Sequence, residues 1–319
     1  MRLKWLIFAI IILPIIANGN DENKTEDAKI LAYKIINSVS HPVNYSVYNG
    51  KIIQGDINLS ERKIINGKIN ITGASFNGSL DFSNTQFEED VIFRDVIFNN
   101  YVNISGANFL KYSEFSNCTF KRVLVSNPGD NPTNFQREAN FYNSRFLENA
   151  DFERAQFNNN ANFGNTTFID ASFKSAIFKA DWISFENSNF TGSANFELAQ
   201  FEAAVNFANS KINIAIFTES NFDSHPDFNN CKFNNAKFSK SKFYDGCAFT
   251  DSIFTDLAHF DHINFYKTTK FDETDFLQDA HFSDSLFNES ADFIFKRNTP
   301  QLAADGIKGM RIQLGLGSD

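Results

Sequence analysis

The 319-residue chain has little tryptophan, methionine or cysteine. It contains 2 Trp, 2 Met and 3 Cys, against 39 Phe. An ordinary protein core mixes several apolar side chains to fill irregular space at high density. A chain that depends on one large residue fills the same space many times, which indicates a repeat architecture.

Basic clusters and long apolar runs are also scarce. No Lys/Arg cluster of useful length occurs, and the formal net charge is −9, or −11 once Arg2 and Lys4 are removed. This balance disfavours nucleic-acid binding through a basic patch and is typical of a soluble, self-repelling surface. Beyond the N-terminal run, no segment approaches the length of a membrane span. We therefore expect no direct nucleic-acid binding and no transmembrane span in the mature chain.

The N-terminus has the features of a secretory signal peptide. Two basic residues precede an apolar run over residues 5–17, which is short for a membrane span. Ala17 and Gly19 are the small residues that a signal peptidase requires, so cleavage is predicted between Gly19 and Asn20. No Cys follows the run, which argues against a lipoprotein. The protein is expected to be extracytoplasmic, secreted or at the cell surface, with an uncleaved N-terminal membrane anchor as the alternative.

Phenylalanine recurs at steps of about five residues from Phe76 onward, and four steps sum to about 22. Arranged by this period, the chain forms four columns with 41 positions, of which 37 are Phe. The residue two before each position is Ala, Ser, Thr or Cys at 31 of the 41 sites, and the residue between is usually polar. Neither helical spacing nor simple strand alternation fits this period. The first column is predicted to run from Phe120 to Phe141, and the third through Asp130.

This pattern of a small, a polar and a large apolar residue followed by two variable residues resembles the pentapeptide-repeat family. The resemblance covers about residues 74–295. It implies an all-β fold, a right-handed quadrilateral parallel β-helix (a solenoid). The frequent sixth residue per unit departs from the motif and implies looser corners. Some members of the family are acidic rods that bind DNA gyrase, and that role is an alternative function here.

The ends of the repeat need cover, because each coil contacts only its neighbours. Residues 24–39 have the pattern of a short amphipathic N-terminal capping helix, with Asn23 and Glu26 as a capping-box-like start. The predicted segments are a signal peptide (1–19), the capping helix and linker (20–50), irregular first coils (51–73), the repeat β-helix (74–298) and a C-terminal tail (299–319).

One segment breaks the repeat. Residues 126–134 contain two Pro, one Gly and three Asn, which is turn chemistry. Asp130 stands at a predicted core position, and burial of an unpaired carboxylate is too costly to tolerate. We therefore expect a projecting bulge, with Asn127, Asp130 and Asn131 as candidate contact residues for a partner. The residue count from Phe120 to Phe141 predicts that the register continues through it.

Metal, thiol and catalytic chemistry are weakly supported. His259 and His281 are 22 residues apart at outward positions, so they are weak candidates for a shared metal ion, but no third ligand stands out. Cys118, Cys231 and Cys247 all occupy the small inward position, where each would replace Ala as a buried residue. No catalytic constellation appears, and no cofactor is expected.

Ten Asn-x-Ser/Thr sequences occur, and those within the repeat fall at outward positions. In an exported protein some would carry glycans. The candidate acceptors include Asn44, Asn58, Asn70, Asn103 and Asn189. Composition alone also explains such sequences in an Asn-rich repeat.

The sequence thus predicts a non-enzymatic exported or cell-surface scaffold with a protein or envelope partner. A β-helix enzyme acting on polysaccharides is a further alternative, since paired carboxylates on a solenoid face can perform acid–base chemistry. The minimal coils leave no long loops to build a cleft for it.

Overall fold

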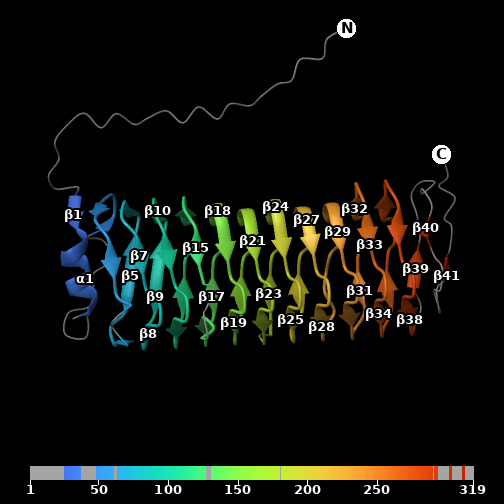
Figure 1. The fold of residues 1–319 in the computed structure, drawn as a ribbon, viewed down its shortest axis with the longest axis horizontal. Helices are drawn as coiled ribbons and strands as arrows, with labels where there is room; N and C mark the ends of the chain where they lie inside the picture. The colour runs from blue at the N-terminus through green and yellow to red at the C-terminus, as the bar shows by residue number, and fades with distance from the viewer. Residues whose placement is uncertain are drawn as a thin grey trace, which may run out of the picture.

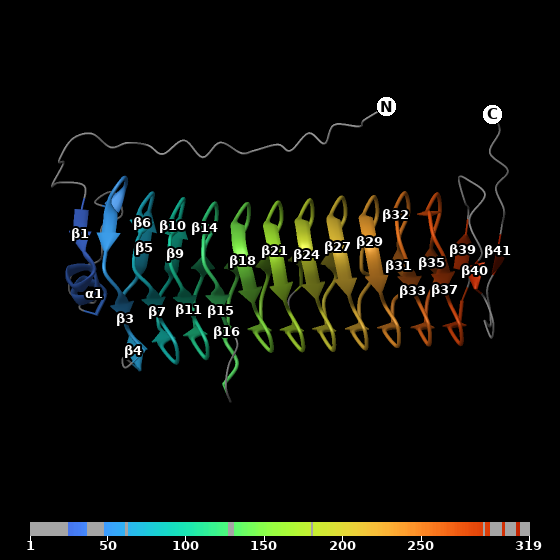
Figure 2. The same ribbon diagram turned by 45° about the horizontal axis from the view of Figure 1, so that its top comes forward.

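The computed structural model describes residues 25–36, 48–60, 63–126, 131–179, 181–289, 291–293, 302–303 and 311–312. In this part of the chain, about 10 turns of parallel β-solenoid stack along one axis, and a short helix lies at the N-terminal end (Figure 1). The turned view shows the same stack of similar coils (Figure 2). The predicted right-handed quadrilateral β-helix is confirmed.

Each coil has four faces, and its strands form hydrogen-bonded sheets with the strands of neighbouring coils. One large sheet spans two adjacent faces of the quadrilateral. Every strand pairs in parallel with its counterparts in the adjacent coils. The 19-stranded sheet begins with β1 (Thr25–Asp27), which pairs with β2. Its first face contains β2 (Ile52–Gln54), β6 (Ser75–Phe76), β10 (Ile97–Phe98), β14 (Thr119–Phe120), β32 (Ile253–Phe254) and β36 (Asp275–Phe276). Its second face contains β3 (Ile57–Asn58), β7 (Leu80–Asp81), β11 (Val102–Asn103), β15 (Leu124–Val125), β33 (Ala258–His259), β37 (Ala280–His281) and β40 (Leu302–Ala303).

Five longer strands turn the corner between these two faces without a break. They are β18 (Arg145–Asp151), β21 (Thr167–Ser172), β24 (Asn189–Asn195), β27 (Lys211–Ile216) and β29 (Lys232–Lys237).

The other two faces are separate sheets. The 11-stranded sheet contains β4 (Ile64–Ile65), β8 (Gln86–Phe87), β12 (Asn108–Phe109), β16 (Asn134–Phe135), β19 (Gln156–Phe157), β22 (Ile177–Phe178), β25 (Gln200–Phe201), β28 (Asn221–Phe222), β30 (Lys242–Phe243), β34 (Asn264–Phe265) and β38 (Leu286–Phe287). The fourth face contains β5 (Ile69–Thr72), β9 (Val91–Arg94), β13 (Ser113–Glu114), β17 (Ala139–Asn140), β20 (Ala161–Asn162), β23 (Ile183–Ser184) and β26 (Val205–Asn206). Single bridges through Asp227 connect this sheet to β31 (Cys247–Ala248), β35 (Thr269–Lys270), β39 (Ala291–Phe293) and β41 (Arg311–Ile312).

The core consists of stacked phenylalanine rings. In the middle of the rod, Phe173, Phe196 and Phe217 are fully buried and nearly parallel, with ring centroids 4.9 Å apart. This distance matches the strand spacing of roughly 4.8 Å, so one ring fits each coil. Rings of neighbouring columns meet edge to face, as Phe185 and Phe196 do at 5.3 Å. Both arrangements are favourable for aromatic pairs.

The coil before Phe76 keeps the same pairing with aliphatic residues. Ile53, Leu59, Ile65 and Ile71 are buried in the four columns, and their strands pair in register with the next coil. The first coil therefore differs from the later ones in residue type, and its pairing is regular.

The register of the Phe columns shifts once, against the sequence prediction. Strand β14 pairs with β18, so Phe120 stacks on Phe146, with ring centroids 4.7 Å apart, and not on Phe141. Phe109 likewise stacks on Phe135 at 5.0 Å. The predicted columns are correct on each side of this point and wrong across it.

An insertion at one corner causes the shift. Phe135 follows Ser126 by nine positions. At the same corner of the first Phe coil, Phe87 follows Phe82 by only five positions. Ser126 itself is buried and fills the column position of this coil. The prediction that Asp130 replaces a core Phe was therefore wrong. Four extra residues nearly equal one repeat unit, so the count from one Phe to the next concealed the insertion.

Two of the four corners turn through a residue with positive φ. This residue lies two positions after the column residue, as in Asn143 (φ 57°), Asn165 (φ 55°) and Asn209 (φ 62°). Asn adopts this conformation more readily than other residues with a side chain, which accounts for part of the Asn content of the repeat. From Phe76 onward, and apart from the insertion, these corners span five residues. The sixth residues predicted to loosen the corners lie at the other two corners.

The N-terminal cap is a strand followed by a helix. Helix α1 (Ala28–Ile36) buries Ala28, Leu31 and Ile35 against the first coil. It is shorter than predicted, because Thr25–Asp27 forms β1 and pairs with β2. The predicted capping box was wrong, since Asp27 Oδ1 accepts the Lys29 N–H at 2.7 Å and caps the helix instead. Asn23 lies outside the described residues.

Candidate functional site

Buried hydroxyl groups link successive coils at the corners with positive φ. Where the small inward residue after such a turn is Ser or Thr, its hydroxyl donates to the main-chain carbonyl of a column residue in the preceding coil. Ser188 Oγ donates to Phe163 O at 2.7 Å and Ser210 Oγ to Phe185 O at 2.7 Å. Thr133 keeps the same bond to Ile104 O, at 2.8 Å, directly after the insertion. Sequence reasoning identified these residues only as small.

Two of the three cysteines belong to this hydroxyl ladder. The thiols of Cys118 and Cys231 lie 3.3 and 3.0 Å from the carbonyl oxygens of Phe93 and Phe207. These cysteines are buried at the small inward position, as predicted, and their thiols also make the contact that Ser and Thr make in other coils. Cys247 lies outside the ladder. All three are free and buried. Burial raises the pKa of each thiol, to about 12 for Cys231, so none is a ready nucleophile at neutral pH.

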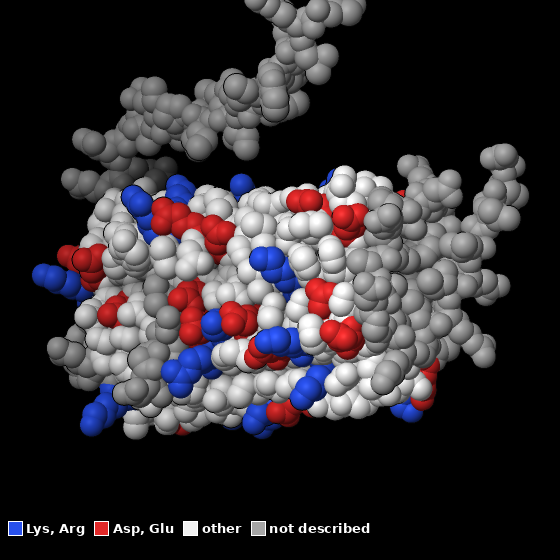
Figure 3. Space-filling view, turned by 45° about the vertical axis from the view of Figure 1, so that its right-hand side comes forward, with Lys and Arg blue, Asp and Glu red and all other residues white. Residues whose placement is uncertain are grey.

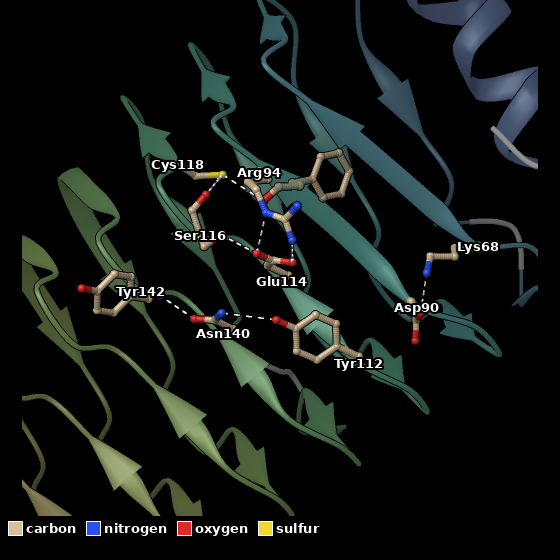
Figure 4. A network of polar contacts seen from close by, with 10 residues as sticks. Lys68, Asp90, Arg94, Tyr112, Glu114, Ser116, Cys118, Asn140 and Tyr142 are labelled. Atoms are coloured by element: carbon tan, nitrogen blue, oxygen red, sulfur yellow. Dashed lines mark hydrogen bonds and ion pairs between the residues drawn. The ribbon is translucent and has the colours of Figure 1, made fainter. Parts of the chain in front are cut away.

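A polar network on the fourth face surrounds the buried carboxylate of Glu114 (Figure 4). Arg94 donates to both of its oxygens, with Nε to Oε1 at 2.9 Å and Nη2 to Oε2 at 2.5 Å. Ser116 Oγ donates to Oε1 at 2.5 Å. The bond to Glu114 raises the pKa of the Arg94 guanidinium. Because strong donors occupy both oxygens, Glu114 cross-links coils and is poorly suited to proton transfer.

A second network, of tyrosine and asparagine side chains, begins on the same face and continues toward the C-terminus. Asn140 Nδ2 donates to Tyr112 Oη at 3.3 Å, and Asn140 Oδ1 accepts the Tyr142 N–H at 3.0 Å. Asn165 Nδ2 then donates to Tyr142 Oη at 2.6 Å. Burial raises the pKa of Tyr112. The network contains no nucleophile beside a free base, so its chemistry is structural.

The two candidate metal-binding histidines are neighbours, as predicted. His259 and His281 are register partners, and their rings stack with centroids 5.2 Å apart. Lys237 is the register partner of His259 on the other side. Asp261 Oδ2 lies 3.5 Å from His259 Nδ1. Within the described ranges, no group of three or more His, Cys, Asp or Glu side chains is placed to hold a metal ion.

The candidate contact and glycosylation residues fall partly outside the described ranges. Asn127, Asp130 and Asn44 lie outside them, as do Gly19 and Asn20 of the predicted cleavage site. Asn131 lies in the insertion and is exposed. The remaining candidate acceptors directly precede column residues. They are Asn58, which is exposed, and Asn70, Asn103 and Asn189, which are partly buried.

A pocket that sequence reasoning missed lies over β24, β27 and β29. Its volume is about 380 Å³. Side chains from three successive coils line it: Asn189, Phe190, Thr191, Lys211, Ile212, Asn213, Lys232 and Asn234. The signal was present in the repeat, since Lys211 and Lys232 each directly precede a column residue in consecutive coils.

The stacked coils and their inward columns define a β-solenoid protein with a repeated five-residue unit. A family model described as pentapeptide repeats (9 copies) matches residues 64–108, 133–177, 185–225 and 249–294. These segments make up more than half of the sequence, so the chain belongs to the pentapeptide-repeat family. The gap after residue 108 contains the insertion, and the gap after residue 177 contains the longer step from Phe178 to Phe185.

Pentapeptide-repeat solenoids are generally structural or binding proteins and not enzymes. A comparison with curated proteins found no match. Among the described residues, no helix has both the length and the apolar character needed to cross a bilayer.

Proposed function

We propose that this protein is a non-enzymatic binding scaffold, exported or held at the cell surface, whose outer faces contact a protein or another envelope component. The observation that carries this proposal is the fixed arrangement of outward side chains. Amide groups of successive coils bond to each other, as Asn99 to Asn77 at 2.8 Å and Asn230 to Asn209 at 2.7 Å. Side chains that are already ordered lose less entropy when a partner binds.

The ionisable groups give less support to an enzyme that cleaves polysaccharides. Such an enzyme needs two carboxyl groups on either side of a bound sugar. Glu114 is saturated by its donors, and surface carboxylates such as Glu197 pair with lysines of a neighbouring coil, here Lys174 at 2.9 Å.

DNA mimicry with DNA gyrase as the partner is the second candidate, and the net charge of −9 favours it. A DNA duplex carries one negative charge per ~1.7 Å of its axis. Here cations interrupt the carboxylates, as in the pairs Lys240–Glu219 at 3.1 Å and Lys267–Glu289 at 3.0 Å. Figure 3 shows both signs interspersed over one face of the rod. This pattern supports the scaffold over the mimic.

Cell fractionation with N-terminal sequencing tests the location. The proposal expects mature protein beginning at Asn20 outside the cytoplasm. Full-length protein in the cytosol that also inhibits DNA supercoiling by gyrase would overturn it in favour of the mimic.

A pull-down from envelope material, with the mature protein as bait and mass spectrometry as readout, tests the binding role. A denatured and quenched sample of the same protein is the control, because it keeps the composition and loses the ordered faces. Equal recovery of every captured protein by both samples would argue against a role for the faces.

A further inference from the structure

The pocket over β24, β27 and β29 contains an electrostatic imbalance. Lys211 and Lys232 are direct register partners, so their main chains are one coil apart, roughly 4.8 Å. Both side chains are exposed. Like charges placed opposite each other on a sheet destabilise it.

No carboxylate in the described part of the chain forms an ion pair with either lysine. Several other lysines do pair with a carboxylate, as Lys174, Lys240 and Lys267 each do with a glutamate. An anion that contacts both ammonium groups would relieve the repulsion, and the acidic protein supplies no such group of its own here.

The other lining residues present neutral hydrogen-bonding groups beside the lysines. Asn234 Nδ2 donates to Asn213 Oδ1 at 3.1 Å, and Thr255 Oγ1 donates to Asn234 Oδ1 at 2.9 Å, which fixes both amides. Asn189 and Thr191 add an amide and a hydroxyl on the adjacent coil. Amides and hydroxyls at fixed positions suit a ligand that carries several hydroxyl groups.

Two residues of the core columns lie beneath the pocket. Ile212 stands between Phe190 and Phe233 in a column that is otherwise mostly Phe, and the side chains of Ile212 and Phe190 are buried in the core. A volume of about 380 Å³ is at the lower end for small-molecule sites. The pocket is therefore suited to a small ligand that its exposed polar side chains recognise.

An extended peptide is a poor fit. Strand β27 pairs with β24 on one side and β29 on the other, so its backbone is not available for strand addition. Recognition must use the side chains. We infer that this pocket binds an anionic sugar unit, with Lys211 and Lys232 holding its carboxylate or phosphate group and the asparagines contacting its hydroxyl groups.

Titration by nuclear magnetic resonance and calorimetry tests the inference. The probes are glucuronate and glucose 6-phosphate, which distinguish a carboxylate from a phosphate, with glucose and inorganic phosphate as references. The protein should be produced without N-glycosylation, because Asn189 lines the pocket and is a candidate acceptor. At least one sugar anion should bind more tightly than both references, with shift changes centred on β24, β27 and β29.

Variants locate the site. Lys211→Gln and Lys232→Gln should each weaken binding of the sugar anion about five-fold, as expected for one exposed charge contact. Lys242→Gln, an exposed lysine on the 11-stranded sheet, is the matched control and should leave the affinity unchanged. Equal weakening by all three variants, or unchanged binding in the Lys211→Gln/Lys232→Gln double variant, would overturn the inference. Inorganic phosphate binding as tightly as the sugar anions would also overturn it.

The unliganded protein provides a second measurement. Because the two lysines repel each other, Lys232→Gln should keep or raise the melting temperature. A clear fall would show that the pair serves the fold, which contradicts a role as a ligand site.

Discussion

Replacement of Phe196 with Ala tests the four-column core where it is most regular. The Phe196 ring is fully buried between Phe173 and Phe217, each 4.9 Å away, and meets Phe185 and Phe207 edge on at 5.3 and 5.4 Å. The backbone ladder holds the coils at their spacing, so the cavity left by the ring collapses little. The free energy of unfolding should fall by about 3–5 kcal/mol.

Urea denaturation followed by circular dichroism measures this loss, and hydrogen exchange reports whether it is local. Because each coil contacts only its neighbours, reduced protection should centre on the coil of Phe196 and the two beside it.

Asn195 is the matched control, because it is adjacent in sequence and points outward. Its Oδ1 accepts the Glu197 N–H at 2.9 Å, so Asn195→Ala should cost about 1 kcal/mol. Asn195→Asp keeps an acceptor and should cost less. Similar losses for Phe196→Ala and Asn195→Ala would refute the inward and outward assignment on which the fold argument rests.

Three further predictions test other parts of the chain. Cys231→Ser should keep the bond to Phe207 O. The wild-type protein should lose stability as the pH rises from about 8.5, where unfolded thiols release their protons. This loss should continue toward about 12, the pKa of the buried Cys231 thiol. Urea denaturation at pH 7 and 10 should show a smaller loss in the variant, and equal losses would contradict this. Added zinc should not raise the melting temperature of the wild type, and a rise that His281→Ala removes would contradict this. Replacement of residues 127–132 by Ser-Asn restores the five-residue corner and should keep or raise the melting temperature, because a shorter loop costs less closure entropy. A clear fall in the melting temperature would contradict the register described here. Partners that this variant no longer captures in the pull-down would identify the insertion as their contact.

The four-column core could be predicted from the sequence because burial acts on every repeat in the same way. Each unit places one large and one small residue inward, so the period of Phe76, Phe82, Phe87 and Phe93 predicts both the number of faces and the side chains inside. The neighbouring positions of His259 and His281 followed from the same period.

The candidate pocket was only partly accessible from the sequence. The period places Lys211 and Lys232 in adjacent coils, but the amides and the hydroxyl that complete the lining depend on the geometry of the corner between two faces. The hydroxyl ladder was also hidden, because the pattern shows that Ser188 is small but not which carbonyl it reaches.

Outside the insertion, the amino-acid pattern was enough to predict the inward residues, the solenoid fold and the family, because these depend on a local motif repeated many times. The pairing of coils across the insertion could be read only from the three-dimensional structure. A residue count cannot show whether the coil that begins at Phe120 ends 21 residues later, at Phe141, or ends at Phe146. Hydrogen bonds between coils make that choice, since they align whole strands and leave the extra residues at a corner.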